Sequence, residues 1–286
     1  MNAWLVVNTF MDKSKFRNLY ELLSTAFNKR HVNLQIKRAE DISLEVGKAI
    51  IDKPDFAIFW DKDIYLAERL EAQGIKLFNS SSAINLCDNK ALMYQELAKN
   101  NIRIPRTFIA PKTFEGLNYK NRDFLDKVTN EIGWPIVIKE AYGSFGEQVY
   151  LAHNLDEANT IIDKIGYKDF LMQEFIVSSK GRDVRINVVG NQVVASMVRE
   201  NKNDFRSNIS SGGSGTSYQP NQDFIDLAVK ASKALGLDFA GVDVMFGDNG
   251  PIICEVNSNP QFASTLAATG INLADYIADF ILRKVC

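Results

Sequence analysis

Two carboxylates and one amide near the C-terminus are the residues whose types and spacing best suit metal chemistry. Asp243 lies in Ala-Gly-Val-Asp-Val, and Glu255 and Asn257 lie in Cys-Glu-Val-Asn-Ser-Asn-Pro. Such hard oxygen ligands favour Mg²⁺ over zinc. Because Mg²⁺ held by few protein ligands usually accompanies a nucleotide phosphate, this group predicts a nucleotide site built by other parts of the chain.

The two segments that carry these ligands are predicted to form one β-hairpin. The sequence Gly-Asp-Asn-Gly-Pro at 247–251 suits a three-residue loop, and pairing of its two ends would set Asp243 opposite Glu255. Asn257 would share their face, because side chains alternate along a strand. Opposed carboxylates repel one another without a cation, which favours a metal. The other face is expected to carry Val242, Val244, Cys254 and Val256.

A lysine followed by a glycine-containing turn forms a second candidate group. Lys139 ends the apolar run 136–138, and Gly143, Ser144 and Gly146 follow it. Glycines let backbone N–H groups approach oxygen atoms closely, and the lysine adds positive charge, so the segment suits a loop over phosphates. The Walker A spacing is absent. An ordinary hairpin turn would use the same residues.

A third group follows along the chain. The strand end at 173–176 offers backbone groups to an adenine edge, and Asp183 offers a carboxylate to a ribose hydroxyl. Basic and amide side chains then recur on the next strands and in the polar segment after them: Arg185, Asn187, Arg199, Arg206 and Asn208. Such donors match the anionic oxygens of a triphosphate or an acyl phosphate. Exposed arginines in salt bridges are the alternative interpretation.

The bulk composition excludes several classes of protein. The chain has 286 residues, 46% of them hydrophobic, and a formal net charge of −2, which gives no basis for a nucleic-acid or membrane partner. It contains no apolar stretch long enough to span a membrane. Three cysteines without a CxxC pair indicate reduced thiols in a cytoplasmic protein. The first strand is not followed by GxGxxG, which argues against a dinucleotide-dependent oxidoreductase.

The elements that must position these groups predict an α/β protein, α+β in part, with three domains. Residues 1–82 alternate strands and helices, which indicates a small parallel sheet covered by helices. Residues 83–170 indicate a compact α+β unit with antiparallel strands, and residues 171–286 carry longer strands and the metal ligands. Polar residues at the strand ends of the first domain would line a cleft, or would be ordinary loop residues: Asn8, Thr9, Asp61 and Asn79.

Three further segments have sequence patterns that predict a helix, a linker or a loop. The spacing of apolar residues predicts helices over 42–51 and over 266–284. The stretch Ser-Ser-Gly-Gly-Ser-Gly-Thr-Ser at 210–217 is interpreted either as a linker or as a mobile loop over a substrate.

Taken together, the motifs resemble those of ATP-grasp ligases of the RimK type. They occur in family order over roughly residues 80–270, whereas the N-terminal part matches only in its α/β pattern. The motifs are Cys-Asp-Asn-Lys at 87–90, Val-Ile-Lys at 137–139, Gly-Ser-Phe-Gly at 143–146, Gln-Glu-Phe-Ile at 173–176, Gly-Arg-Asp-Val-Arg at 181–185, Asp-Phe-Arg-Ser-Asn at 204–208, Gly-Gly at 212–213, Ala-Gly-Val-Asp at 240–243 and Glu-Val-Asn at 255–257. The implied fold clasps the nucleotide between the second and third domains.

The resemblance also implies residue roles. The implied nucleotide-binding residues are Lys90, Lys139, Gly143, Ser144, Gly146, Glu174, Phe175, Ile176, Asp183, Arg206, Ser207 and Asn208. The implied catalytic residues are Lys139, Arg185 and Arg206, and the metal ligands are Asp243, Glu255 and Asn257. The last three would bind two Mg²⁺ ions, with Mn²⁺ as the alternative metal and Glu255 as the bridging ligand.

The implied reaction has two steps. ATP phosphorylates a substrate carboxylate to an acyl phosphate, and an amine then attacks to give an amide, ADP and phosphate. The substrates would be small molecules, peptides or a carrier-protein tail, and a homo-oligomer is left open. A carboxylate kinase that does not ligate and a nucleotide-binding regulatory protein without catalysis are the alternatives.

Two positions depart from the pattern of this family. Relatives often have Asn-x-Ser-Pro-Gly after the metal ligands, whereas this chain has Asn259 and Gln261 around its proline. Relatives can also carry a basic residue just before Gly-Gly, where this chain has Ser211. Both differences fall on the implied substrate side, so the identities of the acid and the amine stay open.

Overall fold

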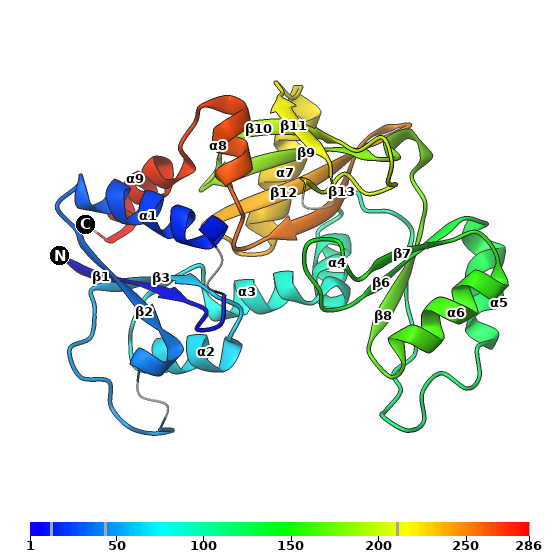
Figure 1. Cartoon of the computed structure of the whole chain (residues 1–286), viewed down its shortest axis with the longest axis horizontal. Coiled ribbons are helices and arrows are strands. Elements are labelled where there is room, and N and C mark those ends of the chain that lie inside the picture. Colours follow the sequence, from blue (N-terminus) through cyan, green and yellow to red (C-terminus); the bar gives the residue numbers. More distant parts are fainter. Residues whose placement is uncertain (12–13, 43–44, 210–211, 286) are drawn as a thin grey trace.

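Three β-sheets organise the chain. Figure 1 shows the computed structural model, which describes residues 1–11, 14–42, 45–209 and 212–285. The N-terminal sheet lies at the left, the sheet that carries the predicted metal ligands lies at the top centre, and a small sheet with two helices lies at the right. The predicted mixture of one parallel sheet with antiparallel sheets is confirmed.

The N-terminal sheet is parallel, with the strand order β2-β1-β3-β4. Its strands are β1 (Asn2–Val7), β2 (Asn33–Arg38), β3 (Phe56–Trp60) and β4 (Leu77–Phe78). Helix α1 (Ser14–Asn28) covers one face and α2 (Ile64–Ala72) the other, which explains why every residue of β3 is apolar and buried. The carboxyl ends of β1 and β3 point toward the middle of the molecule (Figure 1).

The helix predicted over 42–51 is wrong for the described residues of that span. A single 3-10 turn, η1 (Ala39–Asp41), precedes it, and the described residues after it are irregular. Gly47 has a φ of +83°, a left-handed value that a right-handed helix does not contain. The apolar spacing that suggested a helix therefore runs through a turn.

The central sheet is antiparallel, with the order β5-β8-β6-β7. Its elements are β5 (Thr107–Ile109), α5 (Asp123–Ile132), β6 (Ile136–Glu140), β7 (Val149–Ala152), α6 (Leu155–Ile165) and β8 (Phe170–Glu174). The strands and both helices share one hydrophobic core, made only of residues between 108 and 172. The glycine-containing loop joins β6 to β7 and reaches back toward the middle of the molecule (Figure 1).

The C-terminal sheet is antiparallel and has the order β11-β10-β9-β12-β13. Its strands are β9 (Arg182–Val189), β10 (Gln192–Glu200), β11 (Ser214–Ser217), β12 (Phe239–Gly247) and β13 (Gly250–Asn257), preceded by η2 (Val177–Ser179). Helix α7 (Gln222–Ala234) packs on one face together with α3 (Ser81–Asp88) and α4 (Lys90–Lys99). None of the helices in the described ranges is long and apolar enough to cross a membrane.

The β12–β13 hairpin has the predicted opposition of Asp243 and Glu255 but a different turn. Gly247 pairs with Gly250, so the turn holds two residues instead of three. Val244 pairs with Ile253, and Asp243 then pairs with Glu255, which leaves Cys254 as the extra residue of a bulge. The turn is one residue shorter than predicted and the bulge adds one residue, so the two differences cancel and Asp243 still lies opposite Glu255.

Two other predicted segments also differ. The helix predicted over 266–284 is divided into α8 (Ala263–Thr269) and α9 (Leu273–Val285), because Gly270 adopts a left-handed conformation and ends α8. In the predicted linker or loop 210–217, residues 214–217 form the edge strand β11, which pairs with β10. Residues 210 and 211 lie outside the described residues, so the departure at Ser211 has no structural account.

The N-terminal sheet is packed against the C-terminal sheet. Trp60 at the end of β3 stacks on Phe239 of β12, with ring centroids 5.3 Å apart, and contacts Phe262 edge-on at 6.0 Å. The buried amide of Asn79 donates hydrogen bonds to the carbonyl oxygens of Phe239, at 3.0 Å, and Ser258, at 2.8 Å. One hydrophobic core therefore joins these two parts of the chain.

We propose to keep the three-domain division but to move both of its boundaries. A boundary at 82/83 lies within α3, and one at 170/171 lies within β8, which pairs with β5 and β6 of the central sheet. Because domain boundaries fall in connecting segments rather than inside elements, we propose boundaries between β4 and α3 and after Glu174.

Candidate active site

A cavity lies between the central and C-terminal sheets. Its lining includes many of the residues that the sequence analysis singled out: Lys90, Lys139, Gly146, Glu174, Phe175, Ile176, Asp183, Arg206, Ser207, Asn208, Asp243 and Glu255. Four predicted residues do not line it, namely Gly143, Ser144, Arg185 and Asn257. The first two belong to the β6–β7 loop, and the last two lie on strands that flank Asp243.

One end of the cavity is apolar and is formed by the end of β8. Phe175 packs against Phe205, with ring centroids 6.3 Å apart, and Val137 and Met245 add further apolar surface. The backbone of Glu174 is fixed because its N–H donates to the carbonyl oxygen of Arg106, at 3.1 Å. An apolar cavity wall beside the end of a strand suits a purine ring.

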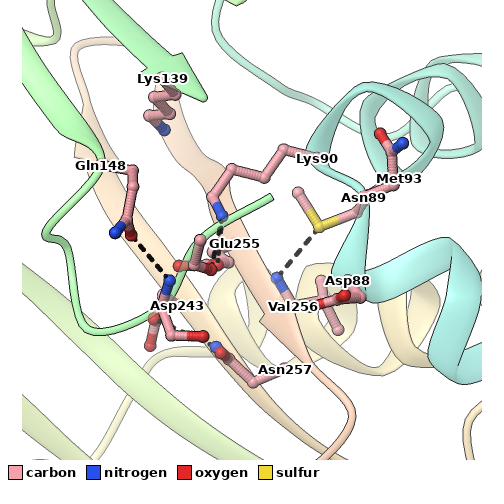
Figure 2. Close-up of polar contacts among 12 residues, drawn as sticks. Asp88, Asn89, Lys90, Met93, Lys139, Gln148, Asp243, Glu255, Val256 and Asn257 are labelled. Atoms are coloured by element: carbon pink, nitrogen blue, oxygen red, sulfur yellow. Dashed lines mark hydrogen bonds and ion pairs between the residues drawn. The ribbon is translucent and has the colours of Figure 1, made fainter. Parts of the chain in front are cut away.

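The opposite end gathers cations around the β6–β7 loop. Lys90 begins α4, and its ammonium donates to the carbonyl oxygen of Gly143, at 3.1 Å, and pairs with Glu255, at 3.4 Å. Figure 2 shows Lys90 between that loop and Glu255, with Lys139 above it. The Ser144 N–H donates to the side chain of Gln148, at 3.0 Å, which shapes the loop from within.

Lys139 is a buried ammonium inside this group. Its Nζ lies 3.2 Å from the hydroxyl of Tyr94, which itself donates to the carbonyl oxygen of Cys254. Burial alone would lower the pKa of Lys139, but the Tyr94 hydroxyl and the nearby Glu255 hold that pKa above its ordinary value. Lys139 is therefore charged at neutral pH and can attract phosphate oxygens.

Arg206 closes the same end from the other sheet. Its guanidinium donates to the carboxylate of Asp204, with a shortest distance of 2.6 Å, and to the carbonyl oxygen of Gly146, at 2.6 Å. The hydrogen bonds from Arg206 lower the pKa of Asp204 below its ordinary range. Gly146 has a φ of +76°, a left-handed conformation that favours glycine, and a Cβ atom there would also come within 2.8 Å of Asn208 Oδ1.

Four charged side chains form a buried network on β9, β10 and β12. Arg199 donates to Asp183, at 2.7 Å, and lies 3.0 Å from Asp243, while Arg185 donates to the other oxygen of Asp243, at 2.9 Å. Burial alone would raise the pKa of Asp243, but the two arginines hold it below its ordinary range. We predicted no specific role for Arg199, although it pairs directly with Asp183 across the sheet.

Protein cations neutralise both of the opposed carboxylates in this structure, so their opposition does not by itself require a metal. Arg185 and Arg199 pair with Asp243, and Lys90 pairs with Glu255. No cluster of three or more His, Cys, Asp or Glu side chains able to hold a metal occurs in the described ranges. The donor chemistry still fits Mg²⁺, since two carboxylates and the amide of Asn257 leave places for phosphate oxygens and water.

The position of Cys254 also differs from the prediction. We expected it on the face opposite the carboxylates, but the bulge turns it toward the cavity that Glu255 lines. Burial raises the pKa of the Cys254 thiol to about 11, so it is protonated at neutral pH and is no nucleophile. The other three residues predicted for that face, Val242, Val244 and Val256, are buried in the core to which α7 also contributes.

The chain is similar to several known proteins. A family model described as "RimK-like ATP-grasp domain" matches residues 87–281. A Mycoplasma pneumoniae protein named "Uncharacterized protein MG012 homolog" is 35% identical over 262 residues, with 90% of this chain and 91% of that protein covered. A "Probable alpha-L-glutamate ligase" of Vibrio parahaemolyticus is 36% identical over 77% of this chain and 71% of its own length.

Two further matches extend over most of the chain. Human "N-acetylaspartylglutamate synthase A" is 30% identical over 88% of this chain, which spans 63% of the human protein. A crystal structure of a RimK domain ATP-grasp protein from Sphaerobacter thermophilus has a TM-score of 0.75 at 21% identity and covers 98% of both chains. The arrangement of sheets described above therefore has a counterpart in a solved structure.

Proposed function

The chain belongs to the RimK-like ATP-grasp family of carboxylate–amine ligases, and we propose that it couples a carboxylic acid to the amine of glutamate. Two of the relatives described above carry glutamate in their names. The names of these relatives support the choice of glutamate, and the observation that carries the ATP-dependent chemistry is the convergence of Lys90, Lys139 and Arg206 with Asp243 and Glu255 at one cavity.

We propose the following chemistry at that end. A carboxylate oxygen of the acid attacks the γ-phosphorus of ATP, the bond from phosphorus to the bridging oxygen breaks, and ADP leaves with that electron pair. The amine nitrogen then attacks the carbonyl carbon of the acyl phosphate. The carbon–oxygen bond to phosphate breaks, and the departing phosphate takes up a proton from the amine.

The protein contributes position and charge to both steps. Lys90 and Lys139 would hold the phosphate oxygens, and Arg206 would stabilise the oxyanion that forms when the amine attacks. Arg185 would act through Asp243, whose carboxylate it orients. The Gly143–Gly146 loop would cover the phosphates, and Glu174, Phe175 and Ile176 would bound the adenine.

The resemblance implies that Asp183 binds the ribose of the nucleotide, and we propose that this contact is weaker than that of an unpaired carboxylate. Both of its carboxylate oxygens accept from Arg199, so a ribose hydroxyl would have to share them. Ser207 and Asn208 line the cavity beside Arg206 and would contact the phosphates.

Asp243, Glu255 and Asn257 would hold Mg²⁺, and two ions are proposed, with Mn²⁺ fitting the same oxygen donors. When bound, the metal neutralises negative charge on the phosphate oxygens. In this structure the charge of the Glu255 carboxylate is paired with the Lys90 ammonium.

A substrate panel tests the proposed ligation. We expect ADP release from Mg²⁺-ATP only when L-glutamate and a second acid are both present, with N-acetyl-L-aspartate and a short peptide whose amine is blocked as the first acids. Mass spectrometry should then detect the amide. ADP release with the acid alone would contradict coupling to an amine and favour a carboxylate kinase.

A further inference from the structure

A lysine of the N-terminal domain reaches the phosphate-covering loop from outside the nucleotide cavity. Lys62 is the second residue after β3, and its ammonium donates to the hydroxyl of Ser144 at 3.2 Å and to the carboxylate of Asp88. Ser144 lies in the β6–β7 loop, next to the Gly143 carbonyl that Lys90 holds. The loop is therefore contacted by one ammonium from α4 and by another from the N-terminal sheet.

Lys62 also stands between the loop and a polar cluster at the junction of the N- and C-terminal sheets. Its backbone N–H donates to the Asp61 carboxylate at 2.7 Å, and the amide of Asn8 donates to the same carboxylate at 3.1 Å. Asn259 donates to the carbonyl oxygen of Asp61 at 2.8 Å, while its own buried side-chain oxygen has no hydrogen-bond partner among the residues that the structure describes. This cluster contains one of the positions at which the chain departs from its relatives.

The Lys62–Asp88 pair is poorly explained as a stabilising contact. The Lys62 side chain is 42% exposed and that of Asp88 is 18% exposed, whereas the Lys90 side chain is 7% exposed. A half-exposed ion pair contributes little to folding, because water competes for both charges. An ammonium in this position can exchange its carboxylate partner for an incoming anion at small cost.

We propose that Lys62 binds anionic oxygens at the place where the γ-phosphoryl group passes from the nucleotide to the acid. This proposal rests on the proposed function. The anion that Lys62 would bind is either the γ-phosphoryl group of ATP or the carboxylate of the acid. Both present oxygen anions to the ammonium, which then leaves Asp88. Through Lys62, the N-terminal domain would contribute a side chain to the site at which the phosphoryl group is transferred.

The test compares Lys62→Met with two matched variants. Lys62→Arg keeps the charge, and Lys53→Met removes an ammonium at the opposite end of the same strand, where Lys53 donates to the carbonyl oxygen of Gln73 at 2.7 Å. Calorimetry measures the affinities for Mg²⁺-ADP and for the non-hydrolysable analogue AMPPNP. Steady-state ADP release measures KM for ATP and for the acid found active in the panel.

If the γ-phosphoryl group is the ligand, Lys62→Met lowers the affinity for AMPPNP about tenfold and leaves that for ADP unchanged. If the carboxylate is the ligand, both affinities stay unchanged, and KM for the acid rises about tenfold while KM for ATP does not. In either case Lys62→Arg recovers most of the loss and Lys53→Met shows none.

Unchanged values in both measurements would overturn the proposal, and so would an equal loss in Lys53→Met. Failure of the unmodified protein to bind either nucleotide would instead refute the proposed nucleotide site, on which Lys62 depends.

Discussion

Replacement of Glu255 by glutamine is expected to lower the ligation rate by about 10³-fold or more, a loss of several kcal/mol of transition-state stabilisation. The substitution keeps the shape of the side chain but removes the charge that pairs with Lys90 at 3.4 Å and that is proposed to hold the metal. The rate is measured at saturating Mg²⁺-ATP, acid and glutamate.

The matched control is Glu200→Gln, which changes an exposed glutamate at the end of β10. It should keep the full rate, and circular dichroism should show both variants folded. A rate for Glu255→Gln within tenfold of the unmodified protein would refute the metal-binding role proposed for this residue.

The second large effect concerns stability. Arg199→Met is expected to reduce the free energy of unfolding by about 3–5 kcal/mol, because it leaves Asp183 and part of Asp243 buried without a compensating charge. Urea denaturation followed by fluorescence measures this change. The same variant should also weaken nucleotide binding, since both aspartates line the cavity.

Two variants separate this explanation from a general loss of packing. Arg182→Met removes an exposed arginine from the same sheet and should cost less than about 1 kcal/mol. Addition of Asp183→Asn to Arg199→Met should restore part of the lost stability, because one unpaired charge disappears. Purely additive losses in the double variant would show that the Arg199–Asp183 pair is not the cause.

Local sequence patterns predicted much of the fold because burial constrains them strongly. Strand β3 is apolar at every position since helices cover both faces of its sheet. Helix α5 has the regular apolar spacing of an amphipathic helix and ends where Gly133 adopts a positive φ. Where glycines with positive φ interrupt apolar spacing, at Gly47 and Gly270, the predictions of continuous helices are wrong.

The candidate site was harder to predict, because its geometry depends on pairing between strands. The bulge that exposes Cys254 to the cavity changes no residue type and so leaves no local signal. The register of β9 and β10 contains a similar irregularity between Val193 and Ala195, and with it Arg199 meets Asp183. A hairpin drawn without that irregularity would set Arg199 beside Arg182 instead, and the buried network would be missed.

The separate cores of the chain bear on the order of events in catalysis. The N- and C-terminal sheets share one hydrophobic core through Trp60, Phe239 and Phe262, whereas the central sheet has a core of its own. Small angular displacements of the central sheet would therefore cost less than displacements between the other two. The junction that carries Asp61 and Asn259 then stays assembled while the nucleotide enters or leaves. An acid bound at this junction would keep its contacts through successive exchanges of ADP for ATP, so its dissociation rate would not have to follow that of the nucleotide.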